Sequence, residues 1–320
     1  MVRLLLSTTV KTTMNAIALQ QTLRQQAPRA FAATQTLCES RRLRVVISPP
    51  FGQRLCWLHG ALSTAFPRLD FVWELGSVTP LPRAGLVQQV VSTVRPHRQT
   101  GGWVNAIGLR NRGMDWAITQ LLPSIDEDIP TRLSLAMTSR EDWDLLLAYA
   151  LRRDKRAVLI RQPLTINLSC PNASHASGET MVSSLGHFLR ALGPSADVMV
   201  KVPPTMRRDQ LKDLLRIGVR SFHACNTLPP DVAGTSGALS GPALVPYTLF
   251  ILAQLHYAAL EVGVPREDIC VVAGGGVYAR ETAAAYIRQG ADVVSIASIW
   301  MSPLRTYKLL RDLNNNLPVD

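Results

Sequence analysis

The strongest constraint on the fold is an alternation, from about residue 42 onward, of short β-branched runs with longer amphipathic stretches. This alternation is typical of repeated strand–helix units that build a parallel sheet. The candidate strands span residues 45–48, 71–77, 132–137, 164–169, 198–202, 221–226, 270–274 and 293–297. Eight such units predict an α/β chain with one (β/α)8 TIM barrel over residues 42–320, and a doubly wound sheet is the alternative.

The stretches between the strands carry helix signals. Ser139 is placed to cap a helix, with Asp142 in position to complete a capping box. Gly218 and Gly290 follow apolar helical patterns and are placed to stop two further helices. In a barrel of this kind the chemistry takes place at the carboxyl ends of the strands, so the residues that directly follow each strand are the candidates for function.

Composition excludes several classes of protein. With 47% hydrophobic and 18% charged residues, the chain can bury a core and is not largely disordered. Its apolar runs are too short for a spanning helix. The 5 cysteines include no CxxC pair, which argues against a disulfide framework and a thiolate zinc site and favours a reducing compartment. No metal site is predicted.

The net charge of +11 is concentrated in part at the N-terminus. Residues 1–38 hold Arg3, Lys11, Arg24 and Arg29 and no acidic residue, which is typical of a mitochondrial targeting peptide. A frayed basic tail and a membrane-surface helix are the alternatives. Residues 1–41 are therefore treated as a basic extension, of which 12–40 is a candidate membrane-contacting segment. The other basic residues are spread out and not interleaved with aromatic ones, so nucleic acid is not expected as a partner.

Small or polar residues follow each of the last five predicted strands. They are Asn167, Ser169, Cys170 and Asn172 after the fourth strand, Lys201 in the fifth, Asn226 and Thr227 after the sixth, 274–276 after the seventh, and Ser298 after the eighth. Asparagine amides both donate and accept, so several of them can bind a planar ring that alternates C=O and N–H groups. A buried lysine needs an anion or an electron-rich acceptor, and a glycine run lets backbone N–H groups approach a phosphate. The sequence therefore predicts a site for a phosphorylated cofactor and a small amide-containing ring.

Seven segments, in order and at similar spacing, resemble the dihydroorotate dehydrogenase family. They are residues 74–80, 104–108, 167–172, 201–204, 226–227, 237–241 and 274–276, and the similarity extends over roughly residues 45–305. The resemblance implies an FMN-dependent barrel that oxidises dihydroorotate to orotate in pyrimidine biosynthesis. In that reaction a base removes the C5 proton while hydride passes from C6 to flavin N5.

The resemblance also implies a role for each matching residue. Cys170 is the implied base, and the implied contacts to the pyrimidine ring are Asn105, Asn167, Asn172, Asn226 and Thr227. Lys201 would face the N1/O2 edge of the flavin and stabilise its negative charge when reduced. The other implied cofactor contacts are Ser77, Asn167, Ser240, Gly241, Gly275, Gly276, Ala297 and Ser298.

The N-terminal quarter departs from the family pattern. Residues 51–58 lack the small residues and the substrate lysine of the quinone-linked class, and Gly76 stands where the soluble class has its lysine. The family's Gly-Asn-Pro segment is also absent after Gly85, and Arg54 is the nearest replacement cation. These departures leave two alternatives open: a flavin enzyme that acts on another dihydropyrimidine, and a non-catalytic barrel of the same family.

The motifs give a mixed indication of the electron acceptor. A cysteine base is typical of the soluble enzymes, whereas residues 77–80 and 239–241 look like the quinone-linked, membrane-associated ones. Together with the basic N-terminus, they favour quinone as acceptor and the mitochondrial inner membrane as location. Fumarate or a similar acceptor, and the cytoplasm, are the alternatives.

Overall fold

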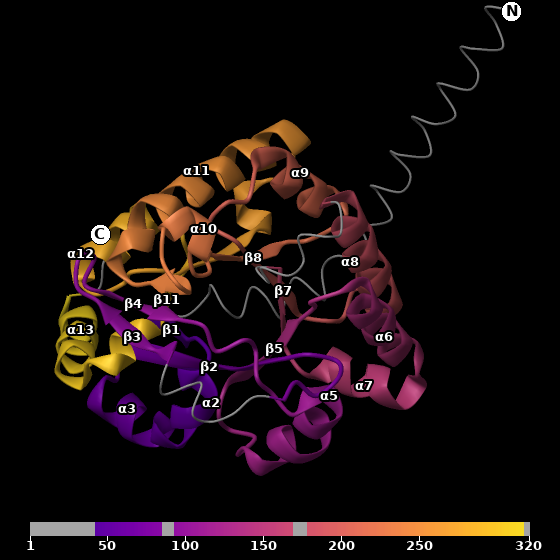
Figure 1. Cartoon of the computed structure of the whole chain (residues 1–320), viewed down its shortest axis with the longest axis horizontal. Coiled ribbons are helices and arrows are strands. Elements are labelled where there is room, and N and C mark those ends of the chain that lie inside the picture. Colours follow the sequence, from indigo (N-terminus) through magenta and orange to yellow (C-terminus); the bar gives the residue numbers. More distant parts are fainter. Residues whose placement is uncertain (1–41, 85–92, 169–177, 317–320) are drawn as a thin grey trace, which may run out of the picture.

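The computed structural model describes residues 42–84, 93–168 and 178–316, and its centre is a closed barrel of eight parallel strands (Figure 1). The strands are β1 (Leu43–Ile47), β2 (Leu69–Val78), β5 (Thr131–Ala136), β6 (Leu164–Asn167), β7 (Val198–Val202), β8 (Ser221–Ala224), β10 (Cys270–Ala273) and β11 (Val293–Ile296). The first strand closes on the last, with Val45 opposite Val294. This closure confirms the predicted (β/α)8 barrel, and each predicted strand overlaps an observed one.

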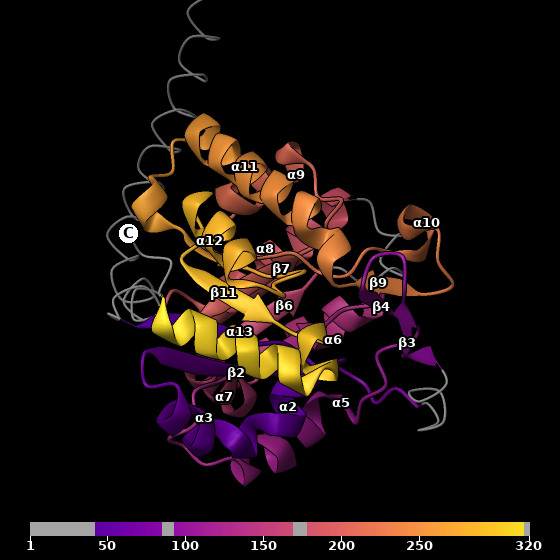
Figure 2. The ribbon, with the colours of Figure 1, turned by 90° about the vertical axis from the view of Figure 1, so that its left-hand side faces the viewer.

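Most of the helices surround the barrel on its outside, whereas the short α10 (Pro230–Ala233) lies beyond its end (Figures 1 and 2). The helices are α2 (Phe51–Leu55), α3 (His59–Ala65), α5 (Gly113–Trp116), α6 (Arg140–Leu151), α7 (Arg153–Arg161), α8 (Gly178–Leu192), α9 (Arg208–Arg216), α10, α11 (Val245–Val262), α12 (Arg280–Arg288) and α13 (Pro303–Asn315). Gly218 and Gly290 follow the ends of α9 and α12, as predicted.

The predicted cap of α6 is present, but the Asp142 side chain does not make the hydrogen bond of a capping box. The Asp142 backbone N–H donates to Ser139 Oγ at 3.2 Å. The Asp142 carboxylate accepts from the Thr138 backbone N–H and hydroxyl, both at 2.7 Å, and not from the Ser139 N–H that a capping box requires. Because the carboxylate reaches one residue further back, it ties the helix to the end of the segment that follows β5.

A second, smaller sheet was not predicted. It pairs β3 (Arg95–His97), β4 (Gly102–Asn105) and β9 (Ala238–Ser240) in antiparallel order β3-β4-β9. Figure 2 shows it beyond the end of the barrel, at the side to which the strands run. Trp103 lies opposite Ser240 and Asn105 opposite Ala238, so this sheet fixes the segment around residue 240 against the segment around residue 104.

Among the described residues, one helix has the length and composition of a membrane span, which the apolar runs of the sequence had not led us to expect. It covers Pro242–Val262 with a mean hydropathy of 1.4. In the structure its main part, α11, packs against α9 on the outside of the barrel, and its buried face includes Ile251, Leu252 and Leu255. The other face exposes Phe250 and Tyr257.

Residues inside the barrel form a cluster separate from the one between the barrel and its helices. The inner apolar layer consists of Val46, Val72, Met199, Val272 and Val293. Their neighbours along the strands, such as Val45 and Phe71, pack into the outer cluster. Side chains of a strand alternate between its two faces, so residues two positions further along face the inside again, nearer the carboxyl ends of the strands.

A buried ion pair joins β5 to the start of β7. The guanidinium of Arg132 binds both carboxylate oxygens of Asp197, at 2.8 and 3.0 Å, and also donates to the Leu164 carbonyl. The two side chains are only 2% and 10% exposed. A buried pair of this kind contributes little net stability, but the loss of one partner leaves the other charge unpaired.

We predict that Asp197→Ala lowers the free energy of unfolding by about 3 to 5 kcal/mol, because Arg132 would remain buried and charged. Urea denaturation measures this change. The matched control is Asp154→Ala, which breaks a pair with Arg152 whose side chains are 62% and 64% exposed. Its cost should stay within about 1 kcal/mol. Equal costs for the two variants would contradict the structural role of the buried pair.

Candidate active site

A polar layer lies directly above the inner apolar layer. Ser48, Glu74, Lys201, Gly274 and Ser295 each follow a member of that apolar layer by two residues on the same strand or at its end. Strand alternation therefore directs these residues to the inside of the barrel, toward the end where barrel enzymes place their chemistry. We call this set, together with His223, the pocket floor.

The lysine and the glutamate of the pocket floor form a buried ion pair. Lys201 Nζ lies 3.4 Å from Glu74 Oε2 and 3.3 Å from Ser48 Oγ. Ser48 donates its hydroxyl proton to Glu74 Oε2 at 2.8 Å, so the 2.9 Å bond between Ser48 and Ser295 is donated by Ser295. The Glu74 side chain is fully buried and that of Lys201 is 10% exposed. Four strands, β1, β2, β7 and β11, are therefore joined by one hydrogen-bond network.

His223 lies beside Lys201, in register on the neighbouring strand β8. Its Nδ1 is 3.8 Å from Glu74 Oε1, which is too long for a hydrogen bond. Among the described residues, neither of these two buried atoms has a hydrogen-bond partner. The pocket floor thus contains a buried histidine and a carboxylate oxygen that face each other without being bonded.

The charges of the pocket floor follow from its contacts. Burial alone would raise the pKa of Glu74, but the nearby Lys201 ammonium holds this pKa well below its usual value. Burial, and next the charge of Lys201, lower the pKa of His223 to about 4. At neutral pH the pocket floor therefore holds one ammonium, one carboxylate and a neutral imidazole.

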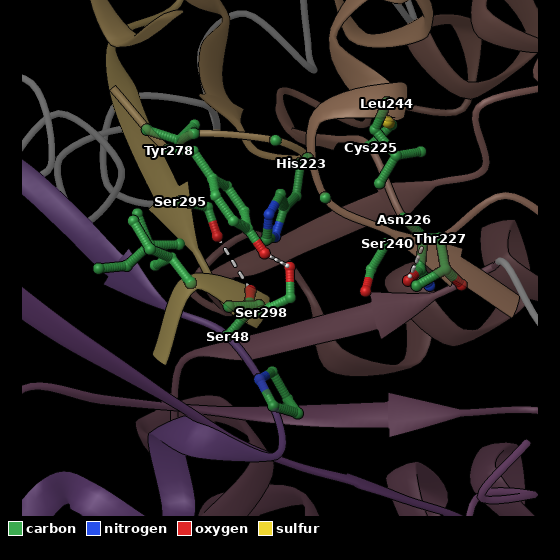
Figure 3. Close-up of a pocket in the computed structure, with 18 of the residues that line it drawn as sticks. Ser48, His223, Cys225, Asn226, Thr227, Ser240, Leu244, Tyr278, Ser295 and Ser298 are labelled. Carbon is green, nitrogen blue, oxygen red and sulfur yellow. Dashed lines mark hydrogen bonds between the residues drawn. The ribbon is translucent and has the colours of Figure 1, made fainter. Parts of the chain in front are cut away.

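A cavity opens above the pocket floor, as Figure 3 shows. The space among its lining residues amounts to about 520 Å³, counting the part that is open to solvent. The lining residues come from the ends of β1, β7, β8, β10 and β11 and from the segment after β9: Ser48, Pro49, Lys201, His223, Cys225–Thr227, Ser240, Gly241, Leu244, Gly275–Tyr278 and Ser295–Ile299.

One wall of the cavity is bare backbone. A Cβ on Gly241 would lie 2.6 Å from Gly102 Cα, and one on Gly276 would lie 2.8 Å from the Gly241 carbonyl oxygen. Both glycines also have a positive φ, 108° and 82°, which other residues rarely adopt. These positions therefore accept only glycine, and the hydroxyl of Ser298 lies beside them, where it accepts from Tyr278 Oη at 3.1 Å. Exposed backbone next to hydroxyl groups is a suitable cradle for a phosphate.

Most of the residues predicted for the site meet in this cavity. Those that line it are Lys201, Asn226, Thr227, Ser240, Gly241, Gly275, Gly276, Ala297 and Ser298. Two more are connected to it by amide hydrogen bonds: Asn226 donates to Asn167 Oδ1 at 3.0 Å, and Asn167 donates to Ser77 Oγ at 3.3 Å.

Three predicted residues are not placed in the cavity. Asn105 lies on β4, where its side-chain amide donates to the Ala238 carbonyl at 3.4 Å, and it is not among the lining residues described. Cys170 and Asn172 lie outside the described residues. Their assignment as base and as ring contact stays a prediction.

Sequence reasoning assigned no role to Ser48, Glu74, His223 or Tyr278, which the structure brings into or below the cavity. For three of them, the sequence contains a pattern that could have indicated a place in the site. Ser48, Glu74 and His223 are polar residues that interrupt or end strongly apolar strands at inward-facing positions. Tyr278 follows the glycine run, and only the folded loop shows that its hydroxyl reaches Ser298.

The predicted replacement cation does not enter the cavity. Arg54 is exposed on α2 and is absent from the described lining. The reason is local packing. Gly52, two residues before Arg54 on the same helix, lies so close to β2 that a Cβ on it would collide with the Glu74 carbonyl oxygen. The helix therefore lies against β2 through its glycine and turns Arg54 to solvent.

Comparison with known proteins agrees with this geometry. The family model described as dihydroorotate dehydrogenase matches residues 64–317, well over half of the chain. The chain belongs to the dihydroorotate dehydrogenase family. This membership confirms both the expected family and the oxidoreductase class that the motifs implied.

Two relatives show how distant the similarity is. The catalytic subunit of dihydroorotate dehydrogenase B (NAD(+)) from Methanopyrus kandleri is 29% identical over 245 residues, which cover 69% of this chain and 71% of that protein. The same subunit from Staphylococcus carnosus is 24% identical over 276 residues, 81% of this chain and 85% of that protein. Among solved structures, DHODH from Eimeria tenella in complex with ferulenol shares the fold, with a TM-score of 0.62 and 15% identity over 85% of this chain and 80% of that one.

These family relatives differ from two expectations. They are bacterial and archaeal proteins and give no support for a mitochondrial or membrane location. Their names specify NAD(+), whereas the motifs at 77–80 and 239–241 indicated the quinone-linked class. The N-terminal extension on which the location was based lies outside the described residues.

The depressed pKa of His223 makes stability depend on pH. As the pH falls, the unfolded chain takes up this proton at about 6.5, whereas the folded protein takes it up only at about 4. Between these values the unfolded state binds more protons, so stability is lost on acidification. We predict that the cofactor-free protein loses about 2 kcal/mol more than His223→Gln between pH 7.5 and pH 5, measured by urea denaturation. Parallel losses in the two proteins would show that His223 is not held neutral.

Proposed function

We propose that this chain binds FMN in the cavity and oxidises dihydroorotate to orotate in pyrimidine biosynthesis. The observation that carries the proposal is the juxtaposition of a buried lysine in the pocket floor with a bare glycine wall in the same cavity. Membership of the family supports the same substrate and reaction.

The described residues fit such a cofactor. Gly241 and Gly276 accept no Cβ because it would meet neighbouring backbone, so this wall stays bare, and Ser240 and Ser298 add hydroxyl groups to the lining. In the proposal this wall holds the phosphate and ribityl chain, with Gly275 and Ala297 also in contact, whereas Ser77 and Asn167 approach the ring. Bound FMN would supply the hydride acceptor. Lys201 would place its ammonium against the ring edge that becomes negative.

Asn226 orients the proposed substrate site. Its Oδ1 accepts from the Thr227 backbone N–H at 2.9 Å, and its Nδ2 donates to Asn167 Oδ1. These bonds fix which end of each amide is a donor and which an acceptor. We propose that Asn226, Asn167 and Thr227, together with Asn105 and Asn172, hold the pyrimidine ring by its amide groups.

We propose Cys170 as the base that removes the C5 proton. A cysteine can accept a proton once its surroundings favour the thiolate. The other cysteine at the site does not suit this role. Cys225 is buried and lies 2.9 Å from Thr248 Oγ1, and burial raises its pKa to about 11, so it remains a thiol at neutral pH.

The missing substrate lysine favours a second candidate function. Among the described lining residues, Lys201 is the only Lys or Arg, and Glu74 already pairs with it. A dihydropyrimidine without a carboxylate would need no further cation. The alternative is therefore a flavin oxidoreductase for an uncharged dihydropyrimidine, and turnover of dihydrouracil compared with dihydroorotate separates the two candidates.

The electron acceptor and the location belong to the proposal as well. The relatives named above support an NAD(+)-linked route over quinone or fumarate. Their bacterial and archaeal origin supports the cytoplasm over the mitochondrial inner membrane.

We predict that the purified protein, loaded with FMN, is yellow and is bleached by anaerobic addition of dihydroorotate. Reduction of the ring removes its visible absorption, so the spectrum reports cofactor, substrate and electron transfer together. Dihydrouracil serves as the comparison substrate. Failure to bind FMN would refute the proposed function, whereas bleaching by dihydrouracil alone would favour the second candidate.

We predict that Cys170→Ala lowers the rate of bleaching by roughly 10²-fold to 10⁴-fold, the range for loss of a general base, with little change in FMN affinity. Rapid-mixing absorbance measures the rate, and fluorescence titration measures the affinity. Cys56→Ala is the matched control, because Cys56 lies on the outer helical segment after α2 and not in the cavity lining. An unchanged rate in Cys170→Ala would remove this cysteine from the mechanism.

A further inference from the structure

The proposed reaction makes no use of His223, although this residue lines the cavity and is only 1% exposed. A buried polar group without a partner carries a cost in stability, so its presence calls for a function. Its Nδ1 faces Glu74 Oε1 across 3.8 Å, and both atoms lack a hydrogen bond among the described residues. Figure 3 shows the imidazole between Cys225 and Ser295 at the base of the cavity.

The groups around His223 leave the pocket floor without net charge. Glu74 faces it from β2 and Lys201 from β7, and their opposite charges cancel. The positive charge of Arg132 on β5 also disfavours the charged form of His223. This charge is paired, because two nitrogens of the guanidinium donate to the two carboxylate oxygens of Asp197. Ser295 on β11 lies near His223 beside Gly274, and Cys225, two residues further along the chain, is a neutral thiol at neutral pH because burial raises its pKa to about 11. A floor of this kind offers a local ammonium but no net positive charge to a ring that becomes negative.

We propose that His223 takes up one proton when the ring bound above the pocket floor gains negative charge, and releases it when that charge is lost. Glu74 Oε1, which faces Nδ1, is the anion that stabilises the resulting imidazolium. The net charge of the pocket floor then changes from zero to +1 in step with the ring. The inference rests on the proposed function, since it needs a ring that is reduced in this cavity.

The proton balance of this step is simple. In the proposed reaction, bound FMN would accept the hydride from substrate C6, and the base would take the C5 proton. The additional proton comes from water and adds to an imidazole lone pair, without any change in a carbon bond. An N–H on Nδ1 suits the facing carboxylate, so the lone pair is on Nε2, which lies next to Gly274. Reoxidation returns this proton to water.

The charge of the ring is what makes the protonation possible. With Lys201 beside it and no anion above it, His223 stays neutral at pH 7, since its pKa is about 4. A new negative charge in a buried site interacts strongly with nearby groups because the local dielectric constant is low. It favours the charged imidazole in the same way as Glu74 does, and the two anions together oppose the effect of Lys201.

The midpoint potential of the bound flavin tests this inference. For a two-electron couple, a tenfold change in an equilibrium corresponds to about 30 mV. Each additional proton taken up on reduction therefore makes the midpoint potential fall by about 30 mV more per pH unit. Spectroelectrochemical titration of the FMN-loaded protein between pH 5.5 and 8.5 gives this slope. We expect the slope of His223→Gln to be less steep than that of the natural protein by about this amount over part of that range.

A matched control accompanies the variant. His256→Gln replaces an exposed histidine on α11, outside the cavity lining, and its slope should equal that of the natural protein. Equal slopes for the natural protein and His223→Gln would overturn the inference. In that case FMN is still bound and still reduced by dihydroorotate, so the proposed function stands. Loss of FMN binding in the natural protein would instead refute the proposed function.

A second measurement applies if His223→Gln does not fold. The natural protein holds 6 histidines, and ¹⁵N-histidine labelling reports whether each imidazole is neutral or charged. Chemical reduction of the FMN-loaded protein near pH 7 should convert one buried imidazole to imidazolium, and air should reverse the change. The absence of any such conversion would overturn the inference.

Discussion

The ion pair between Lys201 and Glu74 is the interaction on which the site depends. Both side chains are buried, so each would be costly without the other, and Ser48 accepts from Lys201 and donates to Glu74 Oε2. The pair spans the barrel from β7 to β2. It therefore fixes the position of the ammonium at the base of the cavity, and every proposed contact to a cofactor is built above that point.

The inside of the barrel is arranged in layers because strand side chains alternate. The barrel holds a compact apolar layer and two buried ion pairs, Lys201–Glu74 in the pocket floor and Arg132–Asp197 between β5 and the start of β7. The two buried ion pairs, Lys201–Glu74 and Arg132–Asp197, each join opposite charges within hydrogen-bond reach, so each pair is electrically balanced. This balance is a condition for burial, and it has a consequence at the site: the lysine that faces the cavity is not a free cation. A group that can gain charge, such as His223, changes that balance at low cost in packing.

The sequence predicts the barrel and most of the cavity lining, because both depend on local patterns. Each strand is a short β-branched run, and the residues after it, such as Asn226 and Gly276, reach one rim in any parallel barrel. The ion pair could not be predicted in this way, since Glu74 and Lys201 meet only through the stagger of strands across the closed sheet. The same applies to the small sheet, which joins Asn105 to a segment beyond residue 230 and draws its side chain to Ala238. Cys170 belongs to a segment outside the described residues, and its role as base stays a prediction from the family resemblance.

The departure of the N-terminal quarter from its family can now be assigned to one part of the site. That quarter still supplies Ser48 and Glu74, which hold Lys201 in place, and Pro49, which lines the cavity. What it does not supply, among the described residues, is a second cation at the cavity, since Arg54 faces solvent. The residues proposed to support the ring are therefore present, and the difference concerns the proposed recognition of the substrate carboxylate. An enzyme with this pattern would keep its flavin chemistry and differ from its relatives in how it selects a substrate anion, which is why the choice between dihydroorotate and an uncharged dihydropyrimidine decides its function.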